Sequence, residues 1–211
     1  MELIRKYFPD LSSKKESQMI QLLRILPVLN AKVNVISRKD IDHLEERHIL
    51  HSLSLARFFS FSGINRILDA GTGGGFPGIP LAIFFPDIEF ILVDSIGKKI
   101  RLVNEITSTL GLKNTTSLNE RVENTNTPVE VVVTRAVASL SVLEKWTREI
   151  IREGKNINPN GLLALKGGNL EDEIRPFLPG INVIPLSGLF EEEYFLTKKI
   201  VYLKKKLPLH P

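Results

Sequence analysis

The residues with the clearest chemical potential lie between Asp69 and Asp94. The segment reads RILDAGTGGGFPG, so an apolar run leads to Asp69 and is followed by Gly71, Gly73 and Gly75 at alternate positions. Glycine has no Cβ, so the backbone can turn tightly there and approach a ligand closely. Such a turn after a first strand is typical of folds that bind a nucleoside-containing cofactor. Asp94 ends the next apolar run, where its carboxylate can accept hydrogen bonds from both hydroxyls of an adenosine ribose.

Two kinds of cofactor are compatible with this turn. Gly73, Gly75 and Gly78 match the G-x-G-x-x-G pattern of dinucleotide sites. Those sites need free N–H groups at a helix N-terminus for the pyrophosphate, and Pro77 has none. A carboxylate at Asp69 also repels pyrophosphate but suits the cationic amino acid end of S-adenosylmethionine (SAM). The D-x-G-x-G-x-G pattern therefore favours SAM, with a ligand-free glycine-rich turn as the alternative.

The methyl acceptor is constrained by residues that the chain lacks. It has no cysteine, which excludes a thiolate nucleophile for C5 of a pyrimidine, as well as disulfides and cysteine-ligated metals. Methyltransferases of exocyclic amines typically carry an Asn/Asp-Pro-Pro-Tyr turn after the fourth strand, where this chain reads Thr134-Arg135-Ala136-Val137. A ring nitrogen such as guanine N7 presents a free lone pair and needs no base, so it is compatible with the sequence.

Arg135 is the candidate catalytic residue. It follows the apolar run 129–133, and a guanidinium at the end of a buried strand needs an anion or a ring to stack on. A structural salt bridge is the alternative explanation. His48 and His51 resemble a metal pair, but no third ligand is nearby in the sequence, so we expect two helix-surface histidines and no metal site.

Two amphipathic helices are expected before the glycine-rich turn. Residues 12–30 follow a helical period, with capping-box spacing between Ser13 and Glu16, and Pro27 is expected to kink or shorten that helix. The second helix is expected from about residue 40 to residues 59–63.

From residue 65 onward, short apolar strands alternate with helical segments, which requires a parallel sheet covered on both faces. Strands are expected at 66–70, 89–94, 115–118, 129–134 and 161–166, and helices at 78–85, 97–110 and 140–151. Segments 182–185 and 199–203 are β-rich with no helical pattern between them, which predicts a terminal hairpin. We therefore expect an α/β, Rossmann-like SAM-dependent methyltransferase fold with a mostly parallel seven-stranded sheet, an antiparallel C-terminal edge hairpin and an N-terminal helical extension. Residues 1–62 would form the extension and residues 63–211 the cofactor-binding domain, as one compact unit.

The charge balance is mildly basic. Lys+Arg 28 against Asp+Glu 24 gives a net charge of +4, which permits a polyanionic partner without requiring one. The basic residues recur in short groups: Arg5 with Lys6, Lys14 with Lys15, Arg38 with Lys39, Lys98 with Lys99, and Lys204 to Lys206. The N-terminus does not resemble a signal peptide, and no apolar run reaches the roughly 20 residues of a membrane span. We expect a cytoplasmic monomer without a membrane partner.

Six blocks of the sequence, in order, resemble the family of ribosomal RNA small subunit methyltransferase G, also called glucose-inhibited division protein B. They are NVISRKD…EERHILHSL (Asn34 to Leu53), DAGTGGGFPGIPLAI (Asp69 to Ile83), LVDSIGKKIRLVNEI (Leu92 to Ile106), RVE (Arg121 to Glu123), TRAVASL (Thr134 to Leu140) and ALKGG (Ala164 to Gly168). The resemblance implies transfer of a methyl group from SAM to N7 of a guanosine in 16S rRNA, near the decoding centre. It also implies 16S rRNA or the small ribosomal subunit as the partner, without deciding between them.

Carried over residue by residue, the resemblance implies that Gly71 and Phe76 line the SAM pocket, that Val122 and Glu123 border the adenine, and that Arg135 faces the cofactor and the acceptor. The complete expected cofactor-binding set is Asp69, Gly71, Gly73, Gly75, Phe76, Asp94, Val122, Glu123 and Arg135. Many members of the family carry Asp where this chain has His51, so the network around His48 is expected to differ here. Two other functions stay open: a SAM-dependent methyltransferase of another acceptor, and a non-catalytic rRNA-binding assembly factor.

Overall fold

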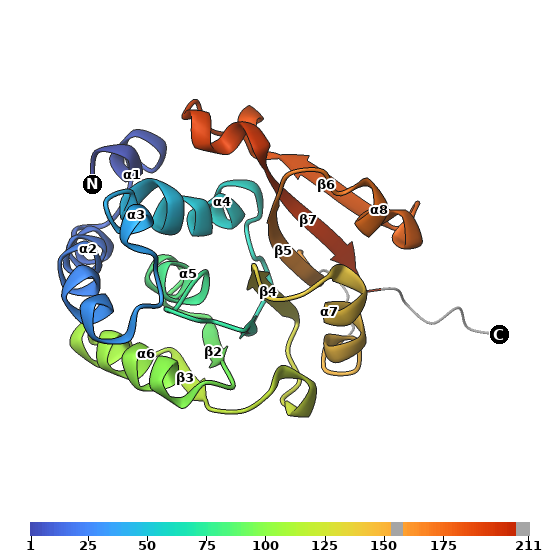
Figure 1. The fold of residues 1–211 in the computed structure, drawn as a ribbon, viewed down its shortest axis with the longest axis horizontal. Coiled ribbons are helices and arrows are strands. Elements are labelled where there is room, and N and C mark those ends of the chain that lie inside the picture. Colours follow the sequence, from blue (N-terminus) through green and yellow to red (C-terminus); the bar gives the residue numbers. More distant parts are fainter. Residues whose placement is uncertain (153–157, 206–211) are drawn as a thin grey trace.

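A twisted seven-stranded sheet with the strand order β3-β2-β1-β4-β5-β7-β6 forms the centre of the molecule (Figure 1). The computed structural model describes residues 1–152 and 158–205, and only the backbone of Arg38; Lys206 of the last basic group lies outside this range. The strands are β1 (Arg66–Ala70), β2 (Glu89–Val93), β3 (Thr115–Leu118), β4 (Val131–Arg135), β5 (Gly161–Gly167), β6 (Ile181–Pro185) and β7 (Lys198–Lys204). The first five are parallel, and β7 is antiparallel to both β5 and β6. The expected fold class is confirmed.

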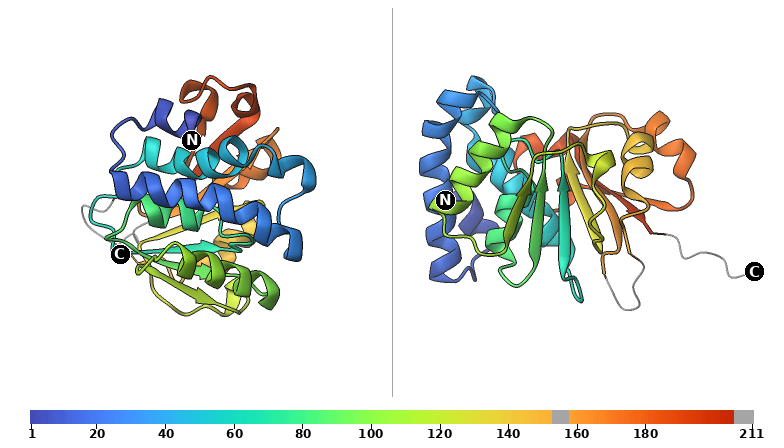
Figure 2. Two further views of the ribbon diagram at one scale, coloured as in Figure 1. Left: turned by 90° about the vertical axis from the view of Figure 1, so that its left-hand side faces the viewer. Right: turned by 90° about the horizontal axis from the view of Figure 1, so that it is seen from below.

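Helices cover both faces of this sheet (Figure 2). The α-helices are α1 (Glu2–Tyr7), α2 (Ser13–Val33), α3 (Arg38–Ile41), α4 (His51–Phe58), α5 (Gly78–Phe84), α6 (Gly97–Thr109), α7 (Leu140–Thr147) and α8 (Glu171–Ile174). A π-helical turn spans Glu45–Leu50, and 3-10 turns span Val122–Asn124, Arg175–Phe177, Leu186–Gly188 and Glu193–Thr197. Of the helices in the described segments, none has the length and apolar character needed to cross a membrane.

Alternate residues of the strands point to opposite faces, and each face has its own core. Ile67 and Val131 join the larger core, which includes residues of α1, α2, α4, α5 and α6. Leu68 and Val132 join the core on the other face, with Leu143 of α7. Because α2 packs against α5 and α6, and α4 packs against α5, the N-terminal helices are part of the cover of one face.

The N-terminal helices differ from the expectation in two ways. The first helix is capped by Ser12, whose Oγ accepts from Lys15 N at 3.5 Å, and it continues through Pro27 to Asn34, which has φ 56. The prediction of a single helix from residue 40 is wrong. The segment is divided into α3, the π-helical turn and α4. The π-helical turn ends at His51, whose N–H donates to the carbonyl oxygens of both Glu46 and His48.

Two expected boundaries near the second face are also wrong. Helix α7 ends at Thr147 and not at Ile151. The residues after it pair with the chain before β4: Val129 forms a parallel bridge with Ile151, and the N–H of Val129 donates to Ile150 O at 2.9 Å. This bridge lies outside β4, which consequently begins at Val131. In the C-terminal hairpin, two 3-10 turns occupy the connection in which no helical pattern was expected. The edge strand is β6, since β7 is inserted between β5 and β6.

Candidate functional site

The glycine-rich turn joins β1 to α5 and is fixed from two sides. Gly71, Gly73 and Gly75 have φ of 68, 60 and 92°, so all three adopt a backbone conformation that favours glycine. Thr72 N donates to Val93 O at 2.8 Å, and Gly73 N donates to Asp94 Oδ2 at 3.0 Å. The turn is therefore attached to the end of β2 as well as to β1.

Asp69 holds this turn from beneath. Its side chain is fully buried, and Oδ2 accepts from Thr72 Oγ1 at 2.7 Å and from Gly78 N at 2.8 Å. Its Oδ1 is also buried and has no hydrogen-bond partner among the described residues. Burial raises the pKa of Asp69 to about 7. Since Asp69 occupies the first N–H of α5 and Pro77 has none, this helix end offers little to a pyrophosphate.

Asp94 lies at the end of β2 and connects three parts of the site. Its side chain is 7% exposed, and besides Gly73 N it accepts from Ile96 N at 2.9 Å, next to the start of α6. Lys99 Nζ lies 3.5 Å from Oδ2. The carboxylate is thus held in one orientation at the carboxyl end of the strand.

A cavity of about 400 Å³ opens in front of the turn, at the carboxyl ends of β1, β2 and β4. Its walls include seven of the nine expected cofactor-binding residues: Gly71, Gly73, Phe76, Asp94, Val122, Glu123 and Arg135. Asp69 and Gly75 are not in its walls. Asp69 lies beneath the turn, and Gly75 faces α5, where an added Cβ would lie 2.3 Å from Ile79 Cδ1. Cofactor-binding roles for all nine residues stay predictions.

The sequence analysis did not identify several wall residues. They are Val35, Thr72, Gly74, Ser95, Ile96, Lys99, Arg121, Ala136, Val137 and Trp146. Val35 reaches the cavity because the loop after α2 places it against Gly74, where an added Cβ would lie 2.9 Å from Val35 Cγ2. Val35 and Val137 lie within blocks that carried the family resemblance, so their sequence signal was present.

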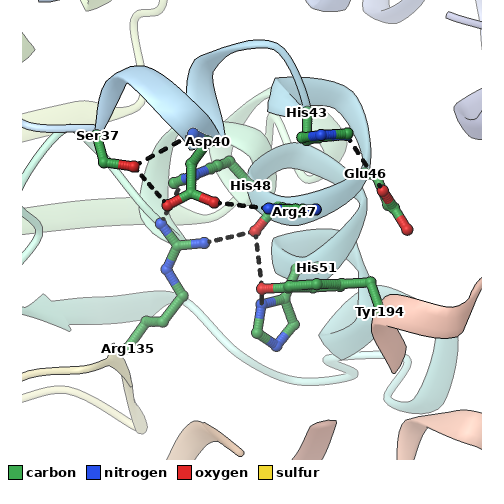
Figure 3. Close-up of polar contacts among 9 residues, drawn as sticks. All are labelled: Ser37, Asp40, His43, Glu46, Arg47, His48, His51, Arg135 and Tyr194. Carbon is green, nitrogen blue, oxygen red and sulfur yellow. Dashed lines mark hydrogen bonds and ion pairs between the residues drawn. The ribbon is translucent and has the colours of Figure 1, made fainter. Parts of the chain in front are cut away.

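Arg135 ends β4 and binds the N-terminal helices (Figure 3). Its Nη1 donates to Arg47 O at 3.0 Å, its Nη2 lies 2.8 Å from His48 Nδ1, and its guanidinium carbon is 5.2 Å from the centre of the Phe76 ring. Burial lowers the pKa of Arg135, although the group stays charged. Within residues 1–152 and 158–205 no carboxylate lies within 4.0 Å of the guanidinium, so the alternative of a structural salt bridge has no support there.

The expectation of two surface histidines is wrong for His51, which is buried, while His48 is partly buried in the wall of a second cavity. Burial and the neighbouring Arg135 lower the pKa of His48 to about 3, so its ring is neutral. Since a guanidinium can only donate, His48 Nδ1 is the acceptor and its proton is on Nε2. His51 is 4% exposed and packs its ring against Tyr194 and Phe195, with Nδ1 3.2 Å from Tyr194 Oη.

His51 Nε2 is buried without a hydrogen-bond partner in the described part of the chain, and burial lowers the pKa of this ring as well. No group of three His, Cys, Asp or Glu side chains suited to a metal ion occurs among the residues that were described.

Known proteins with similar sequences and folds bear on this site. Residues 15–179 match the sequence model of the family described as rRNA small subunit methyltransferase G. A ribosomal RNA small subunit methyltransferase G from Christiangramia forsetii is 48% identical over 207 residues, which is 98% of each chain. One from Bacteroides thetaiotaomicron is 49% identical over 203 residues, covering 96% of this chain and 98% of its own.

Solved structures share the fold at much lower identity. A putative O-methyltransferase from Klebsiella pneumoniae has a TM-score of 0.60 at 13% identity, covering 97% of this chain and 95% of its own. A SAM-dependent O-methyltransferase from Thermotoga maritima has a TM-score of 0.60 at 14% identity, covering 82% and 72%. The fold is that of methyltransferases, and the sequence matches are more specific. The chain belongs to the rRNA small subunit methyltransferase G family.

Proposed function

We propose that this chain transfers a methyl group from SAM to N7 of a guanosine in 16S rRNA, in the cytoplasm. The observation that carries the proposal is the cavity in front of the glycine-rich turn, with Asp94 and Arg135 both in its walls. This cavity occurs in a chain 48% identical to a named rRNA small subunit methyltransferase G over 98% of both lengths.

The residues in and beneath the cavity fit SAM. At Gly73 an added Cβ would meet only Gly71 O, at 3.9 Å, so a ligand can approach the bare backbone there. Asp94, Val122 and Glu123 lie in the cavity walls, which supports the proposal that Asp94 accepts from the ribose hydroxyls and that Val122 and Glu123 border the adenine. The unpartnered Oδ1 of Asp69 lies beneath the turn, and the cationic amino acid end of SAM would favour the ionised form of this carboxyl, whose pKa burial raises to about 7. Bound SAM supplies an electrophilic methyl group on a positively charged sulfur.

The chain's own residues orient the reactants and exclude water. N7 of guanine carries no proton near neutral pH, so no general base is required. Arg135 in the wall of the first cavity fits this requirement, because a guanidinium cannot accept a proton. Arg135 is held by two hydrogen bonds and the Phe76 ring, so its charge has a fixed position beside the reacting groups.

Tritiated SAM offered with small subunits, free rRNA and a protein extract tests the proposed function. We expect label in 16S rRNA, at a guanine whose strand is cleaved by the borohydride and aniline treatment that detects N7 methylation. Label in protein or in small molecules would mean that the enzyme methylates another acceptor. No label with any substrate would mean that the protein is a non-catalytic assembly factor.

The pH dependence of the methyl transfer step separates N7 from other acceptors. With saturating SAM and RNA, we expect single-turnover rates that are nearly flat from about pH 6.5 to 9, because no side chain has to lose a proton. A tenfold rise per pH unit in that range, traced to chemistry and not to binding, would exclude N7 even if the cofactor were correct.

A further inference from the structure

A second cavity, of about 290 Å³, lies at the carboxyl ends of β4 and β5. Arg135 and Ala136 belong to the walls of both cavities, so a group in the second cavity is adjacent to one in the first. Its volume is at the lower end of the roughly 300–1,000 Å³ of small-molecule pockets, which suits a single nucleobase. Enzymes that modify a base commonly take it out of the stack into such a pocket and read its Watson–Crick edge.

Asp40 supplies the sole carboxylate among the described residues that line this second cavity. Its Oδ1 accepts from Arg47 Nη1 at 2.9 Å and its Oδ2 from Ser37 Oγ at 2.8 Å (Figure 3). These two contacts lower the pKa of Asp40, so the group is ionised at neutral pH. The side chain is 41% exposed, and each oxygen has a further lone pair, so Asp40 can accept two more hydrogen bonds.

Guanine has one edge that requires such an acceptor. Its N7 and O6 are acceptors on one side of the base, and N1–H and the 2-amino group are donors on the opposite side. When N7 is turned toward the first cavity, the donor edge faces away from it. A carboxylate there accepts from N1–H and from the 2-amino group together. Adenine has a lone pair at N1 and no 2-amino group, so the same carboxylate repels it.

We propose that the second cavity takes the acceptor guanine and that Asp40 is the residue that selects guanine, by accepting hydrogen bonds from N1–H and the 2-amino group. The inference deepens the proposed function and rests on it. Among the described residues that line this cavity, Asp40 is the one that can offer two charged acceptor oxygens side by side to this edge. Asp40 binds the side chain of Arg47, and the backbone carbonyl of Arg47 accepts a hydrogen bond from Arg135. Recognition of the base by Asp40 is therefore linked to Arg135, which lines both cavities.

Substrate RNA carrying either guanosine or inosine at the methylated position tests the proposal. Inosine lacks only the 2-amino group and keeps N7, O6 and N1–H. In single-turnover reactions we expect the wild-type enzyme to prefer guanosine by about 10-fold or more, since one hydrogen bond to a charged group is lost with inosine. In Asp40→Ala we expect the guanosine rate to fall by at least that factor and the preference to fall to about 1.

Asp40→Ala is expected to fold, because Ser37 Oγ still accepts from the backbone N of residue 40 and caps α3. Asp40→Asn, which keeps the side-chain volume, is a second variant and should show an intermediate preference. The matched control is Asp42→Ala, which removes an exposed carboxylate two residues away that is outside the cavity walls. We expect SAM affinity by calorimetry to be unchanged in all three variants.

The outcomes separate the two proposals. Equal rates for guanosine and inosine with the wild-type enzyme would overturn the role of Asp40 and leave the proposed function intact. The role of Asp40 would also be overturned if Asp40→Ala lowered the rates with guanosine and inosine by the same factor. A residue that acts only by holding Arg47 would not change the preference for guanosine over inosine. No methylation of guanosine by the wild-type enzyme would reject the proposed function, and the role of Asp40 with it.

Discussion

Two physical requirements favour glycine at position 73, a positive φ and open space for a ligand, and they can be tested separately through stability and SAM affinity. Its φ of 60° disfavours any side chain by about 1–2 kcal/mol, and the space in front of it belongs to the first cavity. We expect Gly73→Val to fold but to lose SAM affinity by about 100-fold or more, equivalent to roughly 3 kcal/mol of binding free energy. Titration calorimetry measures the affinity and urea unfolding measures the stability.

Gly111 provides the matched control for this substitution. It has φ 65°, nothing lies within 4 Å of an added Cβ, and it is remote from the first cavity. Gly111→Val should therefore show a similar loss of stability with wild-type SAM affinity. Wild-type affinity in Gly73→Val as well would remove this cavity as the cofactor site.

Arg135 carries a partly buried charge whose removal has opposing effects on stability. In Arg135→Ala, Arg47 O and His48 Nδ1 lose their donor, which costs about 1–3 kcal/mol each, while loss of a desolvated charge offsets part of that cost. We expect the free energy of unfolding to fall by about 2 kcal/mol or less and single-turnover rates to fall by about 100-fold or more. The pKa of His48 should rise from about 3, which NMR titration of the ring detects.

A variant that unfolds, or that keeps the wild-type rate in its folded fraction, would give Arg135 a structural role only.

At the scale of elements, the loop after α2 depends on one buried amide. Asn30 Nδ2 donates to Ile36 O at 2.8 Å, and its Oδ1 accepts from Val35 N at 2.8 Å and Ile36 N at 2.9 Å. We expect Asn30→Ala to lower the free energy of unfolding by about 2–4 kcal/mol, because three hydrogen bonds are lost in a buried position. Since Val35 is in the wall of the first cavity, SAM affinity should fall too.

The control for that prediction is Asn104→Ala on the exposed side of α6, which should change stability by less than about 0.5 kcal/mol. Equal effects of the two substitutions, measured by urea unfolding, would show that the loop does not need the amide.

The elements that could be predicted from the sequence are those with a strong local pattern. Strands β1, β2 and β5 lie within one residue of their expected bounds, because apolar runs bounded by glycine or a charge determine them, and the Thr-rich strand β3 also has its expected bounds. Helix α1 has only six residues and was not expected. It is held by the carboxylate of Glu45, which binds Met1 N at 2.6 Å and Ile4 N at 3.0 Å. No local pattern contains such a partner from 41 residues away.

The candidate site was predictable in type and less so in geometry. Residue spacing identified the glycine-rich turn and Asp94, but could not show that Asp69 points beneath the turn and not into the cavity, since both directions are open at a strand end. The contact of Arg135 with His48 joins residues 87 positions apart, and only the fold brings them together. For the same reason, the burial of His51 under Tyr194 could not be read from its own helix.

At the scale of the molecule, we propose that residues 1–62 and 63–211 form one compact unit. The larger core contains Met19 and Leu22 of α2 together with Phe90 of β2 and Val131 of β4, which supports a common core. The extension is bound at the site as well, through Arg135 and the π-helical turn. Removing it would expose part of one sheet face and would remove Asp40, Arg47, His48 and His51 from the walls of the second cavity.

Two buried groups, His51 and Asp69, and the partly buried His48 make the stability of this unit depend on pH in opposite senses. At pH 5 the rings of His48 and His51 are neutral in the folded chain and protonated in the unfolded chain, because burial lowers both pKa values. Asp69, with its pKa raised to about 7, is protonated when folded and ionised when unfolded. Stability rises with pH wherever the unfolded chain binds more protons. Two histidines outweigh one aspartate, so acidification from pH 6 to 5 should cost about 1 kcal/mol of unfolding free energy.

Two variants should change that slope in opposite directions. His51→Phe removes one of the two histidine contributions and keeps an aromatic ring against Tyr194 and Phe195, so its stability should be nearly independent of pH between 6 and 5. Asp69→Asn removes the opposing contribution, so its free energy of unfolding should fall by about 2 kcal/mol per pH unit on acidification.

Asp40 and Glu192, whose pKa values are lowered, change their protonation mainly below about pH 5. Between pH 5 and 6 the pH dependence therefore comes mainly from His48, His51 and Asp69. Urea unfolding without SAM at half-unit steps from pH 5 to 6.5 measures all three slopes, with the exposed His43→Gln as control. Parallel curves for the wild type and both variants would mean that these rings and this carboxyl titrate alike in the folded and unfolded chain, and that their burial does not determine the acid sensitivity of the protein.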